Sequence, residues 1–178
     1  MQHKCKVSVI DMKCFDDLQA KYLADPKSGV CPFYHVGDEF IFERYDEQDD
    51  FWREGNGSQC AEAWDCISRY IYTALQGGSI MRNWTNDERI MIACCNDGTR
   101  PVIFKIERID YKVLYVSGIR DDSDNQKIAD SLKKINGVSG VNVKPKFIEV
   151  ILNDKNISDE ALTLAAESAG NYKVTCID

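Results

Sequence analysis

The sequence predicts an α+β fold in two domains, residues 1–110 and residues 111–178. Two features lead to this prediction. Seven of the eight cysteines lie within the first 95 residues, so the two parts differ in composition. Both parts also combine amphipathic stretches of helical spacing with short alternating runs typical of strands. A chain of 178 residues can form one large domain or two small ones, and the change in cysteine content favours two.

The clearest element of the front domain is a helix over residues 59–76. Its apolar residues recur at helical spacing and include Trp64, Ile67 and Ile71. Ser58 can cap its start, and Gly77 can supply the left-handed residue that ends it. The other elements predicted here are strands at 6–12, 39–44, 89–95 and 101–109, a short helix at 15–23, an acidic loop at 45–57 and a tight hairpin turn at Asp97-Gly98.

The back domain is predicted to contain, in order, strand, helix, strand, strand, helix and strand. Ser123 and Gln126 form a capping-box pattern at the first of these helices, and Gly170 ends the second. The predicted strands cover 111–117, 138–143, 147–152 and 172–177, and the predicted helices cover 124–135 and 157–169. This order is typical of a ferredoxin-like βαββαβ domain.

Composition and charge limit the kinds of binding partner and the cellular location that we expect. The net charge is −7, and no basic stripe with interleaved aromatic residues is present, so we expect no nucleic-acid partner. No stretch approaches 18 apolar residues, so we expect no membrane-spanning helix. The opening residues contain no apolar run of signal-peptide length. We therefore expect a cytoplasmic protein with reduced cysteines.

Three cysteines from distant parts of the front domain are the main candidates for chemistry. Cys31 lies on a loop, Cys95 ends a strand, and Cys60 would be the second residue of its helix, where free N–H groups favour a thiolate. Together with His35 they could hold zinc or an iron–sulfur cluster. No Cys-x-x-Cys pair is present. The competing interpretation is that these cysteines are small buried apolar residues.

Asp97 and Arg100 flank the predicted hairpin turn. The simpler interpretation gives Asp97 a role in the turn and makes Arg100 a solvated or ion-paired strand end. The functional interpretation is that Arg100 holds an anionic ligand. Only His3 and His35 are available for histidine acid–base chemistry, so an enzyme is the less favoured class.

The front domain also resembles a family of small prokaryotic cysteine-containing proteins. The resemblance is carried by Cys31-Pro32, by the Cys-x-x-Ala-Trp pattern of residues 60–64, and by the long block of residues 91–109. It implies no particular activity. It does imply that Cys31, Cys60 and Cys95 are the shared thiols, and it adds weight to Asp97 and Arg100.

The back domain resembles the heavy-metal-associated domain, a βαββαβ carrier of soft ions such as copper. Residues 137–143 and 170–174 match its second strand and its final turn. The metal loop of that family has the form Gly-Met-x-Cys-x-x-Cys, whereas here Asp121 and Asp124 occupy the two thiol positions. Carboxylates hold Cu(I) poorly. The resemblance therefore implies a domain that does not carry copper and serves docking to a protein partner or self-association.

Three hypotheses for function follow. In the first, the front domain uses Cys31, Cys60 and Cys95 to bind a metal, an iron–sulfur cluster or a small ligand, and the back domain docks to a partner. In the second, the protein is a structural or interaction protein with inert cysteines. In the third, it is a thiol redox protein with Cys60 as the nucleophile.

Overall fold

The computed structural model describes residues 1–45, 48–55, 57, 59–154 and 156–178. Contacts within the chain divide it into two compact units. We call His3–Arg108 the front unit, and Met1–Gln2 with Ile109–Asp178 the back unit. The described residues form four helices, one antiparallel sheet of seven strands and a separate two-stranded sheet. The predicted mixture of helices and strands is confirmed.

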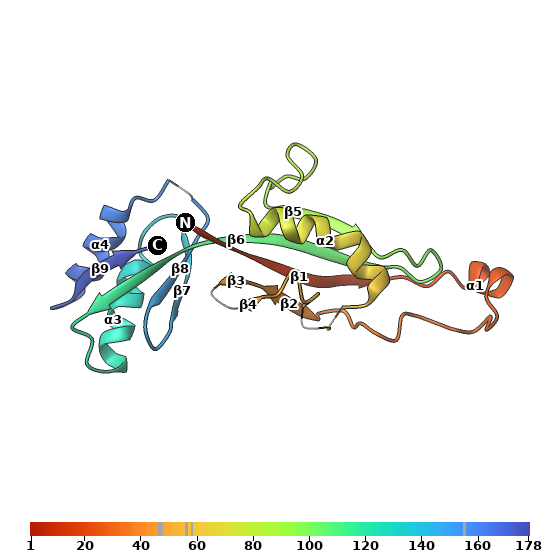
Figure 1. Ribbon diagram of the computed structural model, residues 1–178, viewed down its shortest axis with the longest axis horizontal. Coiled ribbons are helices and arrows are strands. Elements are labelled where there is room, and N and C mark those ends of the chain that lie inside the picture. Colours follow the sequence, from red (N-terminus) through yellow and green to blue (C-terminus); the bar gives the residue numbers. More distant parts are fainter. Residues whose placement is uncertain (46–47, 56, 58, 155) are drawn as a thin grey trace. The chain divides into compact units, whose positions relative to one another are not determined.

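The front unit is built on an antiparallel sheet with one long helix on it. In this sheet β1 pairs with β2 and with β6, and β6 also pairs with β5. Figure 1 shows α2 lying along these strands. The elements are β1 (Gln2–Met12), α1 (Asp16–Tyr22), β2 (Glu39–Phe42), α2 (Ala61–Leu75), β5 (Ile90–Cys94) and the first part of β6 (Val102–Ser117).

The core of the front unit lies between α2 and the sheet. The apolar spacing seen in the sequence is the buried face of α2, which includes Ile67 and Ile71. These residues belong to one cluster with Phe42 of β2 and Phe104 of β6. The helix ends at Leu75 with Gln76 as its C-cap, and Gly77 follows with a φ of 72°, the predicted left-handed conformation.

Both ends of α2 have contacts that the sequence did not predict. The helix begins at Ala61 with Cys60 as its N-cap, so the prediction that Cys60 is the second helical residue is wrong. Ser58, the predicted cap, lies outside the described residues. At the other end the Arg108 guanidinium donates hydrogen bonds to the carbonyls of Gly77 and Gly78. A side chain from β6 thus holds the two glycines that follow the C-cap of the helix.

Two local predictions for the front unit need correction. Gly98 does not have a positive φ, and β5 pairs with β6 only up to Cys94 opposite Ile103, so the connection is a longer loop over residues 95–101. The predicted acidic loop contains a second small sheet, formed by β3 (Arg44–Tyr45) and β4 (Gln48–Asp49). In both places side chains bind nearby backbone groups, which a turn dipeptide or an acidic composition does not reveal.

The back unit contains the rest of β6 followed by two helices and three strands. These are α3 (Asp122–Leu132), β7 (Val138–Val143), β8 (Ile148–Leu152), α4 (Asp159–Ser168) and β9 (Lys173–Ile177). The strands lie in the order β9-β6-β8-β7, and each neighbouring pair is antiparallel. The core joins buried residues of β6, both helices and β8, among them Leu114, Ile128, Ile148 and Leu162.

β6 is longer than the sequence indicated. Strands were expected at 101–109 and at 111–117, whereas the structure has one strand without a break at Asp110. Buried residues alternate along its first part, and then Asp110 and Tyr111 are both buried. This shift in the alternation looks like a strand end in the sequence. None of the described helices combines the length and apolar character that a membrane crossing requires.

Candidate functional site: thiols around Tyr34

The N-terminus of α2 is held by a buried tyrosine that the sequence did not single out. Tyr34 is 1% exposed, and its ring packs edge-on against Phe40 and Phe104. Its hydroxyl donates to Oε1 of Gln59 over 3.1 Å and accepts the backbone N–H of Cys60 over 2.9 Å. One phenol therefore fixes the chain where it enters the helix.

The environment of the Tyr34 phenol includes charges from the three cysteines that the sequence nominated. Burial raises the pKa of Tyr34 to about 12, while the hydrogen bond from the Cys60 N–H opposes the rise. Negative charge on Cys60, Cys31 and Cys95 adds smaller upward contributions to the pKa of Tyr34.

Each of these thiols comes from a different kind of element. Cys31 precedes Tyr34 on the same loop, Cys60 is the N-cap of α2, and Cys95 follows β5. All three are half-buried and pack against the core of the front unit. The thiol of Cys95 also accepts the backbone N–H of Val102 over 3.4 Å. The Cys60 side chain makes no capping hydrogen bond to the helix.

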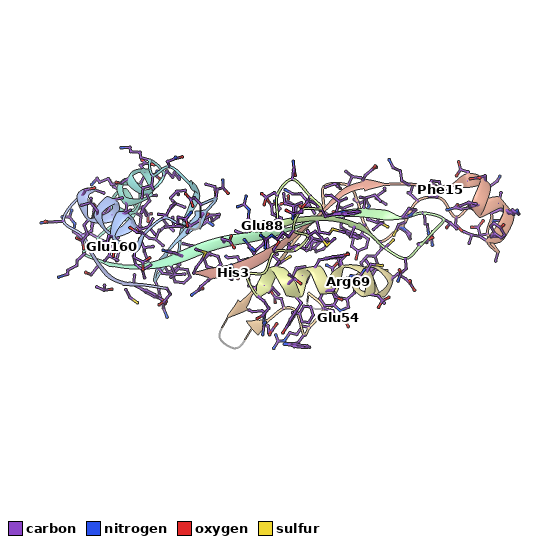
Figure 2. The ribbon with its side chains drawn as sticks, turned by 90° about the horizontal axis from the view of Figure 1, so that it is seen from above. His3, Phe15, Glu54, Arg69, Glu88 and Glu160 are labelled. Atoms are coloured by element: carbon purple, nitrogen blue, oxygen red, sulfur yellow. The ribbon has the colours of Figure 1, made fainter. Side chains whose placement is uncertain are left out.

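A second group of thiols adjoins Cys95 and was missed from the sequence. The Cys66 thiol donates to Oδ1 of Asn96 over 2.8 Å, and the Asn96 amide in turn donates to Asp65 over 3.1 Å. Burial raises the pKa of the Cys66 thiol, and Asp65, Cys94 and Cys95 raise it further. Arg69, labelled on α2 in Figure 2, lowers it.

No sequence signal pairs Cys66 with this site. Asn96 lies 30 residues away, and only the packing of α2 on β5 brings the two together.

Cys5 is different again, because it is fully buried and burial raises its thiol pKa far above the usual range. It is a core residue. All eight cysteines are free thiols.

His35 does not join the three thiols. Its side chain is 84% exposed, and Nδ1 lies 3.8 Å from the Asp38 carboxylate. Its backbone N–H donates to the same carboxylate over 2.7 Å, which places the residue in a surface turn. Among the described residues no group of three or more His, Cys, Asp or Glu side chains is arranged to hold a metal ion. The structure therefore assembles no metal site from Cys31, His35, Cys60 and Cys95, nor from the three cysteines alone.

Asp97 and Arg100 are occupied with each other and with their loop. Oδ1 of Asp97 accepts the backbone N–H groups of Thr99 and Arg100, and Oδ2 accepts Nε of Arg100 over 3.0 Å. Burial acts to raise the pKa of Asp97, but these hydrogen bonds outweigh burial and lower the pKa. The carboxylate organises the loop between β5 and β6, and Arg100 is its ion-pair partner.

In the back unit the two aspartates of the loop before α3, Asp121 and Asp124, have separate structural roles. Asp121 is the N-cap of α3 and accepts the backbone N–H of Asp124 over 3.0 Å. The helix therefore begins at Asp122, upstream of the expected Ser123 cap. Gly118 opens this loop with a φ of 91°, and a Cβ there would lie 2.7 Å from the carbonyl oxygen of Asn171.

Asp124 is a buried carboxylate with a full set of partners. It is 1% exposed. One oxygen accepts the Tyr172 hydroxyl at 2.8 Å and the Lys127 ammonium at 3.1 Å, and the other accepts Nε and the backbone N–H of Arg120, both at 3.2 Å. These hydrogen bonds, led by that of Tyr172, hold the pKa of Asp124 well below its usual range. Two cations and a phenol thus engage both oxygens of the Asp124 carboxylate.

Comparisons with protein-family models, with curated proteins and with solved structures found no match to this chain. The two family resemblances noted in the sequence therefore remain predictions.

Proposed function

We propose that the front unit is a binding module for a soft metal ion, held by thiolates of Cys31, Cys60 and Cys95. The observation that carries the proposal is that all three cysteines are half-buried and pack against the same core, and that the Tyr34 hydroxyl holds the backbone N–H of Cys60 at the start of α2.

An ion that needs only two or three thiolates suits these cysteines better than one that needs four, as structural zinc sites and iron–sulfur clusters usually do. Among the described residues no group of three or more His, Cys, Asp or Glu side chains is arranged to hold a metal ion, so binding would require the three thiols to move closer together. Cu(I) is preferred by thiolates and is bound by two or three of them. The half-buried positions of the three thiols leave them accessible to an ion, unlike the fully buried Cys5.

A specific observation supports the alternative of inert cysteines. The Cys95 thiol already accepts the N–H of Val102, and all three side chains pack against the core. In that case the thiols would fill space around Tyr34 and bind nothing. The following experiment distinguishes the two functions.

The test is an anaerobic titration of the full chain with Cu(I) in competition with a chromophoric Cu(I) chelator. We expect one ion per chain, and an affinity at least about tenfold lower in Cys60→Ser, which corresponds to about 1.4 kcal/mol. Cys31→Ser and Cys95→Ser should act in the same direction. Cys14→Ser and Cys176→Ser are the matched controls and should bind normally. Absence of binding, or equal losses in the controls, would support inert cysteines.

For the back unit we propose a ferredoxin-like fold, similar to a heavy-metal-associated domain, that serves docking and carries no copper. Its element order and the strand order β9-β6-β8-β7 support the fold. The complete set of partners on Asp124 supports the loss of ion binding.

Self-association is the docking mode that can be tested without knowing a partner. Sedimentation equilibrium of the full chain over a range of concentrations should reveal a dimer if the back unit binds a second copy. A monomer at every concentration would contradict self-association and leave a different protein as the partner.

A further inference from the structure

The turn between α3 and β7 contains an asparagine followed by a glycine. Asn136 is exposed, and Gly137 directly precedes β7. The backbone N–H of Val138 donates to the carbonyl of Ile135 over 3.1 Å, so Asn136 and Gly137 are the central pair of a turn. Among the residues that the structure describes, neither the Asn136 side-chain amide nor the Gly137 N–H has a hydrogen-bond partner. Both groups are therefore available to react.

Packing in the back unit requires a glycine after Asn136. Gly137 has a φ of 94°, which residues with a side chain rarely adopt. A Cβ there would lie 2.8 Å from Cβ of Asp154 and 3.1 Å from Cδ1 of Ile157. The Gly137 carbonyl also accepts the N–H of Asn153 over 2.7 Å, which joins the turn to the residue that follows β8. The fold thus places after Asn136 the one residue that has no side chain to shield its backbone nitrogen.

We propose that Asn136 is a site of spontaneous deamidation. Hydroxide removes the proton from the Gly137 nitrogen, which attacks Cγ of Asn136 and forms a new C–N bond. The bond from Cγ to the NH₂ group breaks, and this group leaves as ammonia with a proton from water, which restores the hydroxide. Water then opens the cyclic succinimide at either carbonyl and gives aspartate or isoaspartate. The net reaction consumes water and releases ammonia in equal amounts.

A second Asn-Gly pair in the sequence, Asn56-Gly57, provides an internal comparison. The Gly57 N–H donates to the carbonyl of Arg53 over 3.0 Å, whereas the Gly137 N–H has no such partner. The Gly57 nitrogen must give up this hydrogen bond before it can attack. A hydrogen bond is worth about 1 kcal/mol, which corresponds to about a fivefold change in rate. We therefore expect Asn136 to react at least about fivefold faster than Asn56.

The two products affect the turn differently. Aspartate adds a negative charge at an exposed position and leaves the main chain unchanged. Isoaspartate routes the main chain through the former side chain, so an extra backbone carbon precedes Gly137. This carbon displaces the glycine from its close contacts with Asp154 and Ile157 and from its hydrogen bond with Asn153. Isoaspartate should therefore lower the stability of the back unit, whereas aspartate should not.

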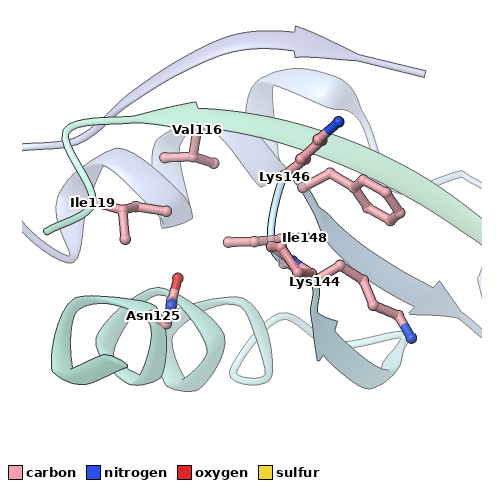
Figure 3. A pocket seen from close by; sticks show the side chains of 8 residues that line it. Val116, Ile119, Asn125, Lys144, Lys146 and Ile148 are labelled. Atoms are coloured by element: carbon pink, nitrogen blue, oxygen red, sulfur yellow. The ribbon is translucent and has the colours of Figure 1, made fainter. Parts of the chain in front are cut away.

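The effect should be confined to this end of β7. Figure 3 shows the other end, where the turn from β7 to β8 lines a pocket with residues that include Lys144, Lys146 and Ile148. Neither Asn136 nor Gly137 lines this pocket. The amide resonances of the pocket residues therefore serve as an internal reference when the reaction is followed by NMR.

The test is incubation of the ¹⁵N-labelled full chain at mildly alkaline pH and physiological temperature, with samples digested and analysed by mass spectrometry. We expect Asn136 to gain the mass that replacement of NH₂ by OH adds, in both aspartate and isoaspartate forms, at a rate that rises with pH. The amide resonances of Val138 and Asn153 should shift as the reaction proceeds, while those of Lys144 and Lys146 stay in place. Asn136→Gln is the matched control and should remain unmodified, because its longer side chain closes the ring far more slowly.

Repeating the incubation in concentrated urea separates the effect of the fold from that of the sequence. Unfolding removes the hydrogen bond of Gly57, so Asn56 and Asn136 should then react at similar rates. The proposal is overturned if Asn136 stays unmodified in the folded chain, or if its conversion does not depend on pH. Equal rates at Asn56 and Asn136 in the folded chain would overturn the role assigned to the unpartnered Gly137 N–H.

Discussion

The two units each place chemically active side chains at the N-terminus of a helix, but they engage them differently. In the front unit Cys60 is the N-cap of α2, and its side chain makes no capping hydrogen bond. The helix is anchored instead by the Tyr34 hydroxyl on the Cys60 backbone N–H. In the back unit the Asp121 carboxylate caps α3 directly, and Asp124 is bound by three side chains.

This difference bears on the proposal that the front unit and not the back unit binds an ion. A carboxylate whose oxygens already accept from Tyr172, Lys127 and Arg120 would have to lose these partners before it could bind a metal. The front unit uses a tyrosine for anchoring and so leaves the Cys60 thiol out of the helix cap. The proposed contrast between the units therefore depends on which group, a phenol or a carboxylate, holds the start of the helix.

The largest effect on stability is expected for Asp124→Asn. The asparagine NH₂ group would face donors from Arg120 and Lys127, and one buried acceptor would be lost. The folded-state pKa of Asp124 is lowered, so its stabilising contribution is fully present above the unfolded-state pKa and is lost as the pH falls through the folded-state value. Urea unfolding should show that the variant has a lower free energy of unfolding than the wild type near pH 7. The difference should shrink below about pH 4.

The matched control for this variant is Asp130→Asn, which changes an exposed aspartate on the same helix. This control variant should lower the free energy of unfolding only slightly at any pH. Equal stability of Asp124→Asn and the wild type at pH 7 would contradict the view that Asp124 is a fully engaged structural group.

A smaller loss is expected for Tyr34→Phe. The ring packing is kept, but Gln59 Oε1 and the Cys60 N–H lose the hydroxyl that binds them. Loss of one buried hydrogen-bonding partner typically costs about 1–3 kcal/mol in the free energy of unfolding. Tyr22→Phe, at an exposed tyrosine, is the control and should leave denaturant unfolding unchanged. If both variants behave alike, Tyr34 does not anchor α2.

Asp97→Asn should lower the free energy of unfolding by about 1 kcal/mol or less. The variant loses a partly exposed ion pair with Arg100 but keeps an oxygen that can accept the loop N–H groups. We expect unfolding free energy to fall slightly and Cu(I) affinity to stay at the wild-type value. A fall in affinity as large as that of Cys95→Ser would extend the binding site into the loop between β5 and β6.

The smallest effect on stability is expected for Cys66→Ser. The serine hydroxyl can replace the thiol as the donor to Asn96, so the free energy of unfolding should change by no more than about 0.5 kcal/mol. If the ion site is limited to Cys31, Cys60 and Cys95, Cu(I) affinity should also be unchanged. A tenfold loss in the chelator competition would identify Cys66 as a further ligand and refute the three-thiol site.

Sequence patterns could predict the long helix and the general mixture of strands and helices because these depend on local periodicity. The spacing of Ile67 and Ile71 corresponds directly to the buried face of α2. The back unit shows the predicted succession of elements for the same reason. The continuous β6 was missed because the shift in alternation at Asp110 and Tyr111 looks like a strand end when only the sequence is read.

The candidate site was predictable only in part, because its key contacts join residues distant in sequence. Three cysteines could be nominated from their local positions, but Tyr34 lies on a loop without periodicity and meets Cys60 across 26 residues. Similarly, Asp124 could be assigned to a helix start, whereas its bond to Tyr172 spans 48 residues. Local pattern indicates which side chains are unusual, and tertiary packing decides their partners.

X-ray absorption at the copper edge tests the central claim most directly, because it reports the atoms bound to the ion. The full chain would be loaded anaerobically with one equivalent of Cu(I), alongside Cys60→Ser and the Cys176→Ser control. The three-thiol site predicts that the copper has sulfur neighbours only, with fewer of them in Cys60→Ser and an unchanged spectrum in Cys176→Ser. Nitrogen or oxygen neighbours in the wild type, or a spectrum that Cys60→Ser leaves unaltered, would contradict it.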